Sequence, residues 1–177
     1  MKIDVVDMDD PILGTHRRNL AQSSGSTVIE MYGMSNGISQ MVSNTRQAAS
    51  LHSIEVLRIW GHGWSGGQLI SAGHDSQIGV DHGSALWANN LPQFQATLSQ
   101  LRNYFVSNGR VELKGCQVAS GNAGEEFLKA LASIFGVNVI GAVETQGGAW
   151  VAGQHWNGPL VQATPNGGLS SVMGQSL

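Results

Sequence analysis

Two residues that are capable of covalent chemistry each follow an apolar or alternating segment of the chain. His62 comes after the segment 53–60, and Cys116 comes after the segment 111–114. A cysteine attacks a carbonyl carbon as the thiolate, and a neighbouring imidazole helps to produce that form. Glycines stand on both sides of His62 and directly before Cys116, and they leave room for a substrate backbone. The two residues therefore form a candidate catalytic pair.

Acyl transfer is the reaction that such a pair favours. Cys116 would attack the carbonyl carbon, His62 would move the protons, and water would release the acyl group. The backbone N–H groups of Gly63 and Cys116 are candidates for an oxyanion hole, and we expect Gly63 and Gly115 to lie against the substrate backbone. This chemistry needs no cofactor and no metal ion.

The pocket that would select the substrate is open to several interpretations. Candidate lining residues are Trp64, Gln117, Glu144 and Trp150. Glu144 would favour a basic residue before the cleaved bond, whereas Lys114 would favour an acidic one.

The elements that must position the pair alternate between strands and helices. Apolar runs bounded by turn residues predict strands at 27–32, 53–60, 111–114 and 137–140. Apolar residues at helical spacing predict helices that begin near residues 38, 92 and 122. This order predicts a three-layer α/β sandwich with a mostly parallel sheet and helices on both faces. Because groups at the carboxyl ends of parallel strands meet at one edge, we expect His62 and Cys116 to be neighbours.

The ends of the chain show weaker patterns. Residues 1–26 are expected to be loosely ordered or to add an edge strand near 3–6. Shorter strand-like pieces occur at 68–71, 150–152 and 160–163. At 177 residues the chain fits one domain, which we place at 27–177.

Composition excludes several classes of protein. Charged residues make up 12% of the chain, about half the usual share, and the net charge is −3 with no Lys/Arg cluster, so nucleic-acid binding is not expected. No apolar run approaches the ~18 residues of a membrane helix. The expected partner is a peptide or protein substrate, and the oligomeric state stays open. Without a recognisable export signal the cytoplasm is the default compartment, although a dedicated secretion apparatus would leave no readable mark.

The order and spacing of the two motifs resemble those of caspase-like cysteine peptidases, which include caspases, gingipains, separases and the self-cleaving domains of large bacterial toxins. Ile59-Trp60-Gly61-His62-Gly63 is similar to the histidine segment of that clan, and Lys114-Gly115-Cys116-Gln117 to its cysteine segment. The stretch 115–131 is also similar to a caspase-like domain of uncharacterised function at the ends of large bacterial surface proteins. The resemblance covers about residues 27–142. It implies a caspase-like sandwich and an endopeptidase with a Cys116/His62 dyad and a thioester intermediate.

Two other interpretations of the same residues remain. A lone cysteine at a strand end is often a small buried hydrophobic residue, so the chain could be a non-catalytic binding or assembly domain on the same scaffold. Gly63-Trp64-Ser65-Gly66-Gly67 also matches the Gly-x-Ser-x-Gly motif of serine esterases, with Ser65 as nucleophile. Its partners would be Asp75 or Asp81 and His155.

One further cluster has residue types that bind metals. His74, Asp75, Asp81 and His82 lie close together in the sequence, but their spacing matches no short metal-binding motif. We interpret the cluster as a polar, exposed loop and expect no metal site.

Overall fold

A seven-stranded sheet forms the centre of this computed structural model, which describes residues 1–9, 13–33, 36–71, 83–146, 156 and 158–173. The strand order is β10-β9-β8-β7-β3-β1-β2. The strands are β1 (Lys2–Asp7), β2 (Thr27–Met31), β3 (Ile54–Trp60), β7 (Phe105–Leu113), β8 (Asn138–Ala142), β9 (Pro159–Ala163) and β10 (Leu169–Met173). The first five are parallel to one another, whereas β9 and β10 are antiparallel to their neighbours.

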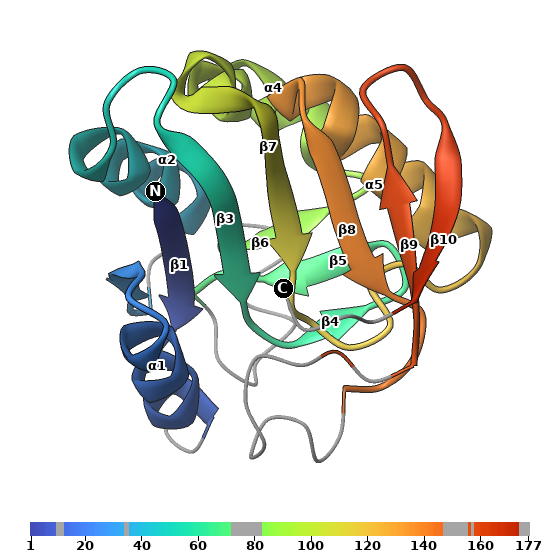
Figure 1. The fold of residues 1–177 in the computed structure, drawn as a ribbon. Coiled ribbons are helices and arrows are strands. Elements are labelled where there is room, and N and C mark those ends of the chain that lie inside the picture. The colour runs from blue at the N-terminus through green and yellow to red at the C-terminus, as the bar shows by residue number, and fades with distance from the viewer. Residues whose placement is uncertain (10–12, 34–35, 72–82, 147–155, 157, 174–177) are drawn as a thin grey trace.

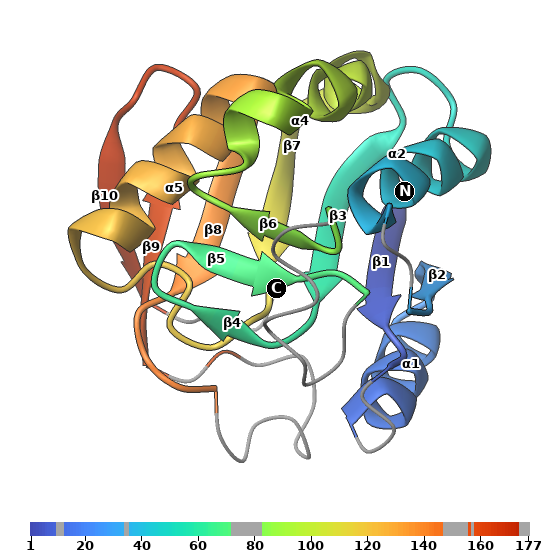
Figure 2. The same ribbon diagram turned by 180° about the vertical axis from the view of Figure 1, so that it is seen from behind.

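Helices lie on both faces of this sheet. They are α1 (Leu13–Ser23), α2 (Gly37–Ala48), α4 (Leu91–Leu98), its 3₁₀ continuation η1 (Ser99–Tyr104) and α5 (Gly121–Phe135). Figures 1 and 2 show α1 on one face and α2, α4 and α5 on the other. Right-handed crossovers require this arrangement. The connection from β1 to β2 through α1 runs toward one edge of the sheet, whereas the connections through α2, α4 and α5 run in the opposite direction, from β2 past β1 to β3 and on to β7 and β8. The predicted three-layer α/β architecture is confirmed.

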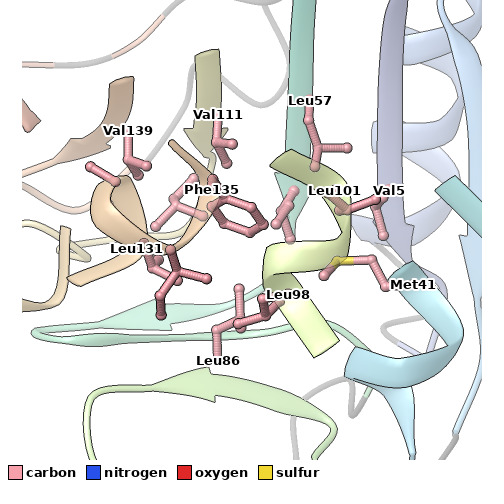
Figure 3. Packing of buried hydrophobic residues seen from close by; sticks show 14 of the residues in the cluster. Val5, Met41, Leu57, Leu86, Leu98, Leu101, Val111, Leu131, Phe135 and Val139 are labelled. Atoms are coloured by element: carbon pink, nitrogen blue, oxygen red, sulfur yellow. The ribbon is translucent and has the colours of Figure 1, made fainter. Parts of the chain in front are cut away.

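The core fills the space between the sheet and the α2–α4–α5 layer (Figure 3). Val5, Leu57 and Val111 point from three adjacent strands toward these helices. Phe135 of α5 meets Phe105 edge to face, with ring centroids 6.1 Å apart. Burial of these apolar side chains removes them from water and fixes the helices on the sheet.

The opposite face of the same strands contains a row of buried charges. Asp4 of β1 pairs in register with Arg58 of β3, which pairs with Glu112 of β7. The guanidinium of Arg58 lies 3.4 Å from the Asp4 carboxylate and 3.1 Å from that of Glu112, and all three side chains are buried. Because burial of an unpaired charge costs several kcal/mol, the row requires all three strands to keep this register.

A second, smaller sheet lies beside the carboxyl ends of the central strands. It consists of β4 (Gly63–Trp64), β5 (Gly67–Leu69) and β6 (Ala85–Trp87), all antiparallel. Figure 2 shows it in front of the ends of β3 and β7, on the side of α4 and α5. The chain enters β4 directly after His62, so this sheet begins at the candidate site.

Most of the predicted strands and helices are confirmed within a few residues, including the end of α5 at Gly136, whose φ of 72° is left-handed. For residues 1–26 the expected strand near 3–6 is confirmed, since residues 2–7 form β1. The expectation of a loose segment or an edge position is wrong, because β1 lies between β2 and β3 and α1 follows it. The strand before Cys116 is also longer than predicted, since β7 begins at Phe105 rather than near residue 111.

Candidate active site

The two candidate catalytic residues leave the sheet from neighbouring parallel strands. In the ladder between β3 and β7, Ile59 pairs with Leu113, and His62 and Cys116 each follow three residues later. The N–H of Lys114 donates to the carbonyl of Ile59 at 2.9 Å and extends the ladder by one step. Both turns therefore begin at the same edge of the sheet (Figure 1).

The two turns are in direct contact. A Cβ atom built on Gly63 would lie 2.7 Å from the carbonyl oxygen of Cys116 and 2.9 Å from the carbonyl carbon of Gly115. Such distances are too short for a real side chain, so only glycine allows the backbones to approach this closely. The residue after His62 thus packs against the peptide that contains Cys116.

Cys116 is held in a tight turn by the segment that follows β8. Gln117 has a left-handed φ of 56°, and its N–H donates to the carbonyl of Glu144 at 3.1 Å. The N–H of Gln146 donates to the sulfur of Cys116 at 3.2 Å. A hydrogen bond of this kind becomes stronger when the acceptor is charged, so the contact favours a sulfur that develops negative charge. The thiol is free and partly exposed, and His62 is half-buried.

A hairpin encloses the cysteine turn from the other side. The hydroxyl of Ser65, in the turn between β4 and β5, donates to the carbonyl of Ser120 at 2.5 Å. The N–H of Gly66 donates to the carbonyl of Val118 at 3.1 Å. The residues after Cys116 are therefore fixed to the hairpin that follows His62.

Two of the predicted pocket residues lie beside the cysteine. Gln117 and Glu144 are both exposed, and the backbone hydrogen bond between them holds them next to Cys116. Trp64 is half-buried, with its ring against Gly67 within the hairpin. Trp150 lies outside the residues that the structure describes.

The expectation that Gly115 contacts a substrate backbone is wrong. Gly115 is buried, and a Cβ atom at this position would lie 2.9 Å from the Cα of Gly63 and 3.0 Å from the side chain of Val118. Its N–H donates to the side-chain oxygen of Gln68 at 2.9 Å. The absence of a side chain at Gly115 instead leaves room for the histidine turn, whose Gly63 packs against it.

Lys114 is also not available to a substrate. Its ammonium lies 3.7 Å from the Glu112 carboxylate and 3.7 Å from the centre of the Trp156 ring, and only 5% of the side chain is exposed. Burial lowers the pKa of Lys114 to about 8, against the opposing attraction of Glu112. The pKa of Glu112 is below its ordinary value even though burial raises it, because Lys114, Arg58 and Arg110 attract the carboxylate.

The serine hypothesis loses its structural context. A nucleophile elbow places the serine between a strand and a helix. Ser65 instead occupies the turn of the β4–β5 hairpin, and its hydroxyl is bonded to a backbone carbonyl. Asp75, Asp81 and His155, the partners considered for it, lie outside the described residues.

The other expectations concern metals and membranes. The candidate metal cluster lies outside the described residues; its members are His74, Asp75, Asp81 and His82. Among the residues that the structure describes, no group of three or more His, Cys, Asp or Glu could hold a metal ion. Within that part of the chain, no helix has the length and apolar character needed to span a bilayer.

Sequence reasoning missed two glutamines of the site. Gln146 follows β8, the third of the adjacent parallel strands, and the same rule that selected His62 and Cys116 could have indicated it. Gln68 lies in a strand of the small sheet, and no local pattern points to its long-range bonds.

Comparison with known proteins identifies one family. A family model described as "Domain of unknown function (DUF4347)" matches residues 13–158, a range that includes both turns of the site. No curated protein and no solved structure matches the chain. Since the description names no activity, the chemistry has to be argued from the geometry of the site.

Proposed function

We propose that this chain, which belongs to the DUF4347 family, is a cysteine peptidase with Cys116 as nucleophile and His62 as general base and acid. One observation supports the proposal most strongly: Gly63, the residue after His62, packs against the backbone of Cys116. The histidine and cysteine turns are thus in contact although the two residues are 54 positions apart in sequence.

The proposed reaction proceeds in two stages. His62 accepts the thiol proton, and the Cys116 sulfur forms a bond to the carbonyl carbon as the C=O electron pair moves to oxygen. The C–N bond then breaks, and the leaving amine takes the proton from the His62 imidazolium, which leaves a thioester. Water then adds to the thioester carbon with loss of a proton to His62, the oxyanion electron pair re-forms the C=O bond, and the C–S bond breaks; the sulfur takes the proton back from His62, and the carboxylic acid product is released.

The surroundings of the sulfur agree with this chemistry. The Gln146 N–H donates directly to the sulfur, and the thiol is partly exposed rather than sealed in the core. Reactive cysteines are found in accessible positions with donors nearby, whereas structural ones are inert and buried.

Glu144 is the proposed specificity residue. It is exposed, and the bond from the Gln117 N–H to its carbonyl holds its main chain beside the nucleophile, while its carboxylate lies against Gly158. A carboxylate at this position attracts a cation, so we propose a peptide with a basic residue before the cleaved bond. Replacement by Gln should raise KM for such peptides and leave KM for neutral ones unchanged.

Alkylation by iodoacetamide tests the dyad directly, because Cys116 is the only cysteine. At pH 7 the His62→Ala variant should react at least about tenfold more slowly than the parent protein, since general-base assistance contributes ~10²–10⁴-fold. His16→Ala, at an exposed position in α1, serves as the matched control and should react at the parental rate.

Hydrolysis is measured with internally quenched peptides. Cleavage that disappears in both Cys116→Ala and His62→Ala supports the peptidase. Equal alkylation rates with and without His62, together with no cleavage, would instead identify a non-catalytic domain on this scaffold. Labelling of Ser65 by a fluorophosphonate would favour the serine esterase.

A further inference from the structure

We propose that Gln68 is the positioning residue of this site: its side-chain amide sets the separation between the His62 turn and the Cys116 turn. The inference rests on the proposed function, because it assigns Gln68 an effect on the reactivity of the dyad.

Both ends of the Gln68 amide are bonded to the two strands in question. The Nε2 group donates to the carbonyl of Ile59 in β3 at 2.6 Å, and the Oε1 atom accepts from the N–H of Gly115 after β7 at 2.9 Å. Gln68 is fully buried, so water does not replace either partner. One planar group therefore spans the two chain segments just before His62 and Cys116.

The amide links the two segments where the backbone bonds between them end. In the part of the chain that the structure describes, the Lys114 N–H also donates to the carbonyl of Ile59. The following N–H, that of Gly115, donates to the side chain of Gln68 rather than to a backbone carbonyl. The two segments are therefore joined by one side chain where the two turns begin.

The backbone of Gln68 is itself fixed against the histidine turn. Gln68 pairs with Gly63 in the β4–β5 hairpin, and the neighbouring N–H of Leu69 donates to the carbonyl of His62 at 2.8 Å. The residue therefore contacts the His62 turn through its main chain and the Cys116 turn through its side chain.

Loss of the two Gln68 hydrogen bonds should lower the reactivity of Cys116 more than it lowers the stability of the fold. The core and the charged row hold β3 and β7 together independently of Gln68. A displacement of about 1 Å between reacting groups can cost ~10² in rate. The expected effect is therefore on the His62-dependent part of the cysteine reactivity.

The test is a double-mutant cycle of iodoacetamide alkylation at pH 7 with the full chain. Gln68→Met keeps the volume but removes both hydrogen bonds, and it should react at least tenfold more slowly than the parent protein. The double variant Gln68→Met/His62→Ala should be no slower than the slower single variant, because Gln68 acts through His62. The matched control is Gln40→Met, which makes the same substitution at a partly buried glutamine of α2, removes only a bond to Asn44 within that helix, and should stay within twofold of the parent.

Each outcome reports on one of the two claims. Equal alkylation rates for the parent and His62→Ala, together with no peptide cleavage, overturn the proposed function. A clear His62 effect, combined with parental reactivity of Gln68→Met or with additive losses in the cycle, overturns the role of Gln68.

A second variant keeps the test decisive if circular dichroism shows that Gln68→Met is misfolded. In Gln68→Glu, the neutral carboxyl group can donate to Ile59 and accept from Gly115 as the amide does, whereas the carboxylate cannot donate. Its alkylation rate relative to the parent should therefore rise as the pH falls from 8 to 5. A constant ratio contradicts the inference.

Discussion

Gly63 determines how closely the two candidate catalytic turns approach. A Cβ atom at this position would lie 2.7 Å from the carbonyl oxygen of Cys116 and 2.7 Å from the side chain of Val118, whereas glycine has only a hydrogen there. The backbone oxygen cannot move aside without shifting the nucleophile. Gly63 is therefore needed because it allows the two turns to pack closely, rather than because it makes the loop flexible.

Gly63→Ala should separate the turns. The expected loss in the free energy of unfolding is about 1–3 kcal/mol from overpacking, and cysteine alkylation should lose its dependence on His62. Urea unfolding and iodoacetamide kinetics measure the two effects. Gly168→Ala is the matched control, because its Cβ atom would meet only the partly exposed side chain of Thr164. Parental reactivity of Gly63→Ala would show that the contact does not set the spacing.

At the residue scale, the sequence was sufficient for the nucleophile candidate and its histidine but not for their supports. Glycine-flanked residues after strand-like segments predict positions at one sheet edge, and both are found there. The roles of Gln68 and Gln146 depend on contacts across 47 and 30 residues. Such pairings follow from the folded topology, which no local pattern encodes.

At the scale of the elements, β7 shows why an inner strand can contain charged residues. Glu112 and Lys114 interrupt the apolar pattern of this inner strand, and Arg58 and Asp4 on neighbouring strands complete their charge pairing. The same effect explains why β1 was expected only as a short edge strand, because Asp4 and Asp7 interrupt its apolar pattern although both are buried. Amphipathic helices such as α5 were predictable because their apolar spacing is local.

The buried position of Lys114 predicts how stability depends on pH. Its pKa of about 8 in the folded protein is below its ordinary value of 10.5, so between these pH values the unfolded chain binds more protons. Stability attributable to this residue must therefore rise with pH across that interval, on the order of 1–3 kcal/mol. Denaturant unfolding of the parent and of Lys114→Met from pH 7.5 to 10 measures the difference.

The rise should be absent in Lys114→Met and present in Lys129→Met, which removes a partly exposed lysine of α5. The same rise in parent and Lys114→Met would mean that the lysine is not desolvated in solution.

At the scale of the whole molecule, the sheet order makes β1, β3 and β7 the most protected part of the structure. Alternation of strands and helices predicted a parallel sheet with right-handed crossovers, and this is what the structure has. The strand order itself was not predicted, since it depends on which strands can pair so that their apolar side chains share one face and their charged side chains meet on the other. The edges are β2 and β10.

Native-state hydrogen exchange measures this hierarchy. The amides of Val5, Leu57 and Val111 should exchange only through global unfolding, because each lies in an inner strand. The bonded amides of the edge strand β10 should exchange at least about tenfold faster through local opening. Exchange in β1 as fast as in β10 would contradict its inner position.

The row formed by Asp4, Arg58 and Glu112 also constrains how the protein matures on the ribosome. Each acidic residue is 54 positions away from the arginine, on opposite sides of it in sequence. The cation is fully neutralised only after residue 112 has emerged, so the earlier strands have to wait in an incomplete, hydrated arrangement while synthesis continues. We therefore expect these distant partners to slow folding, and we expect the central sheet to be completed only after β7 has been synthesised.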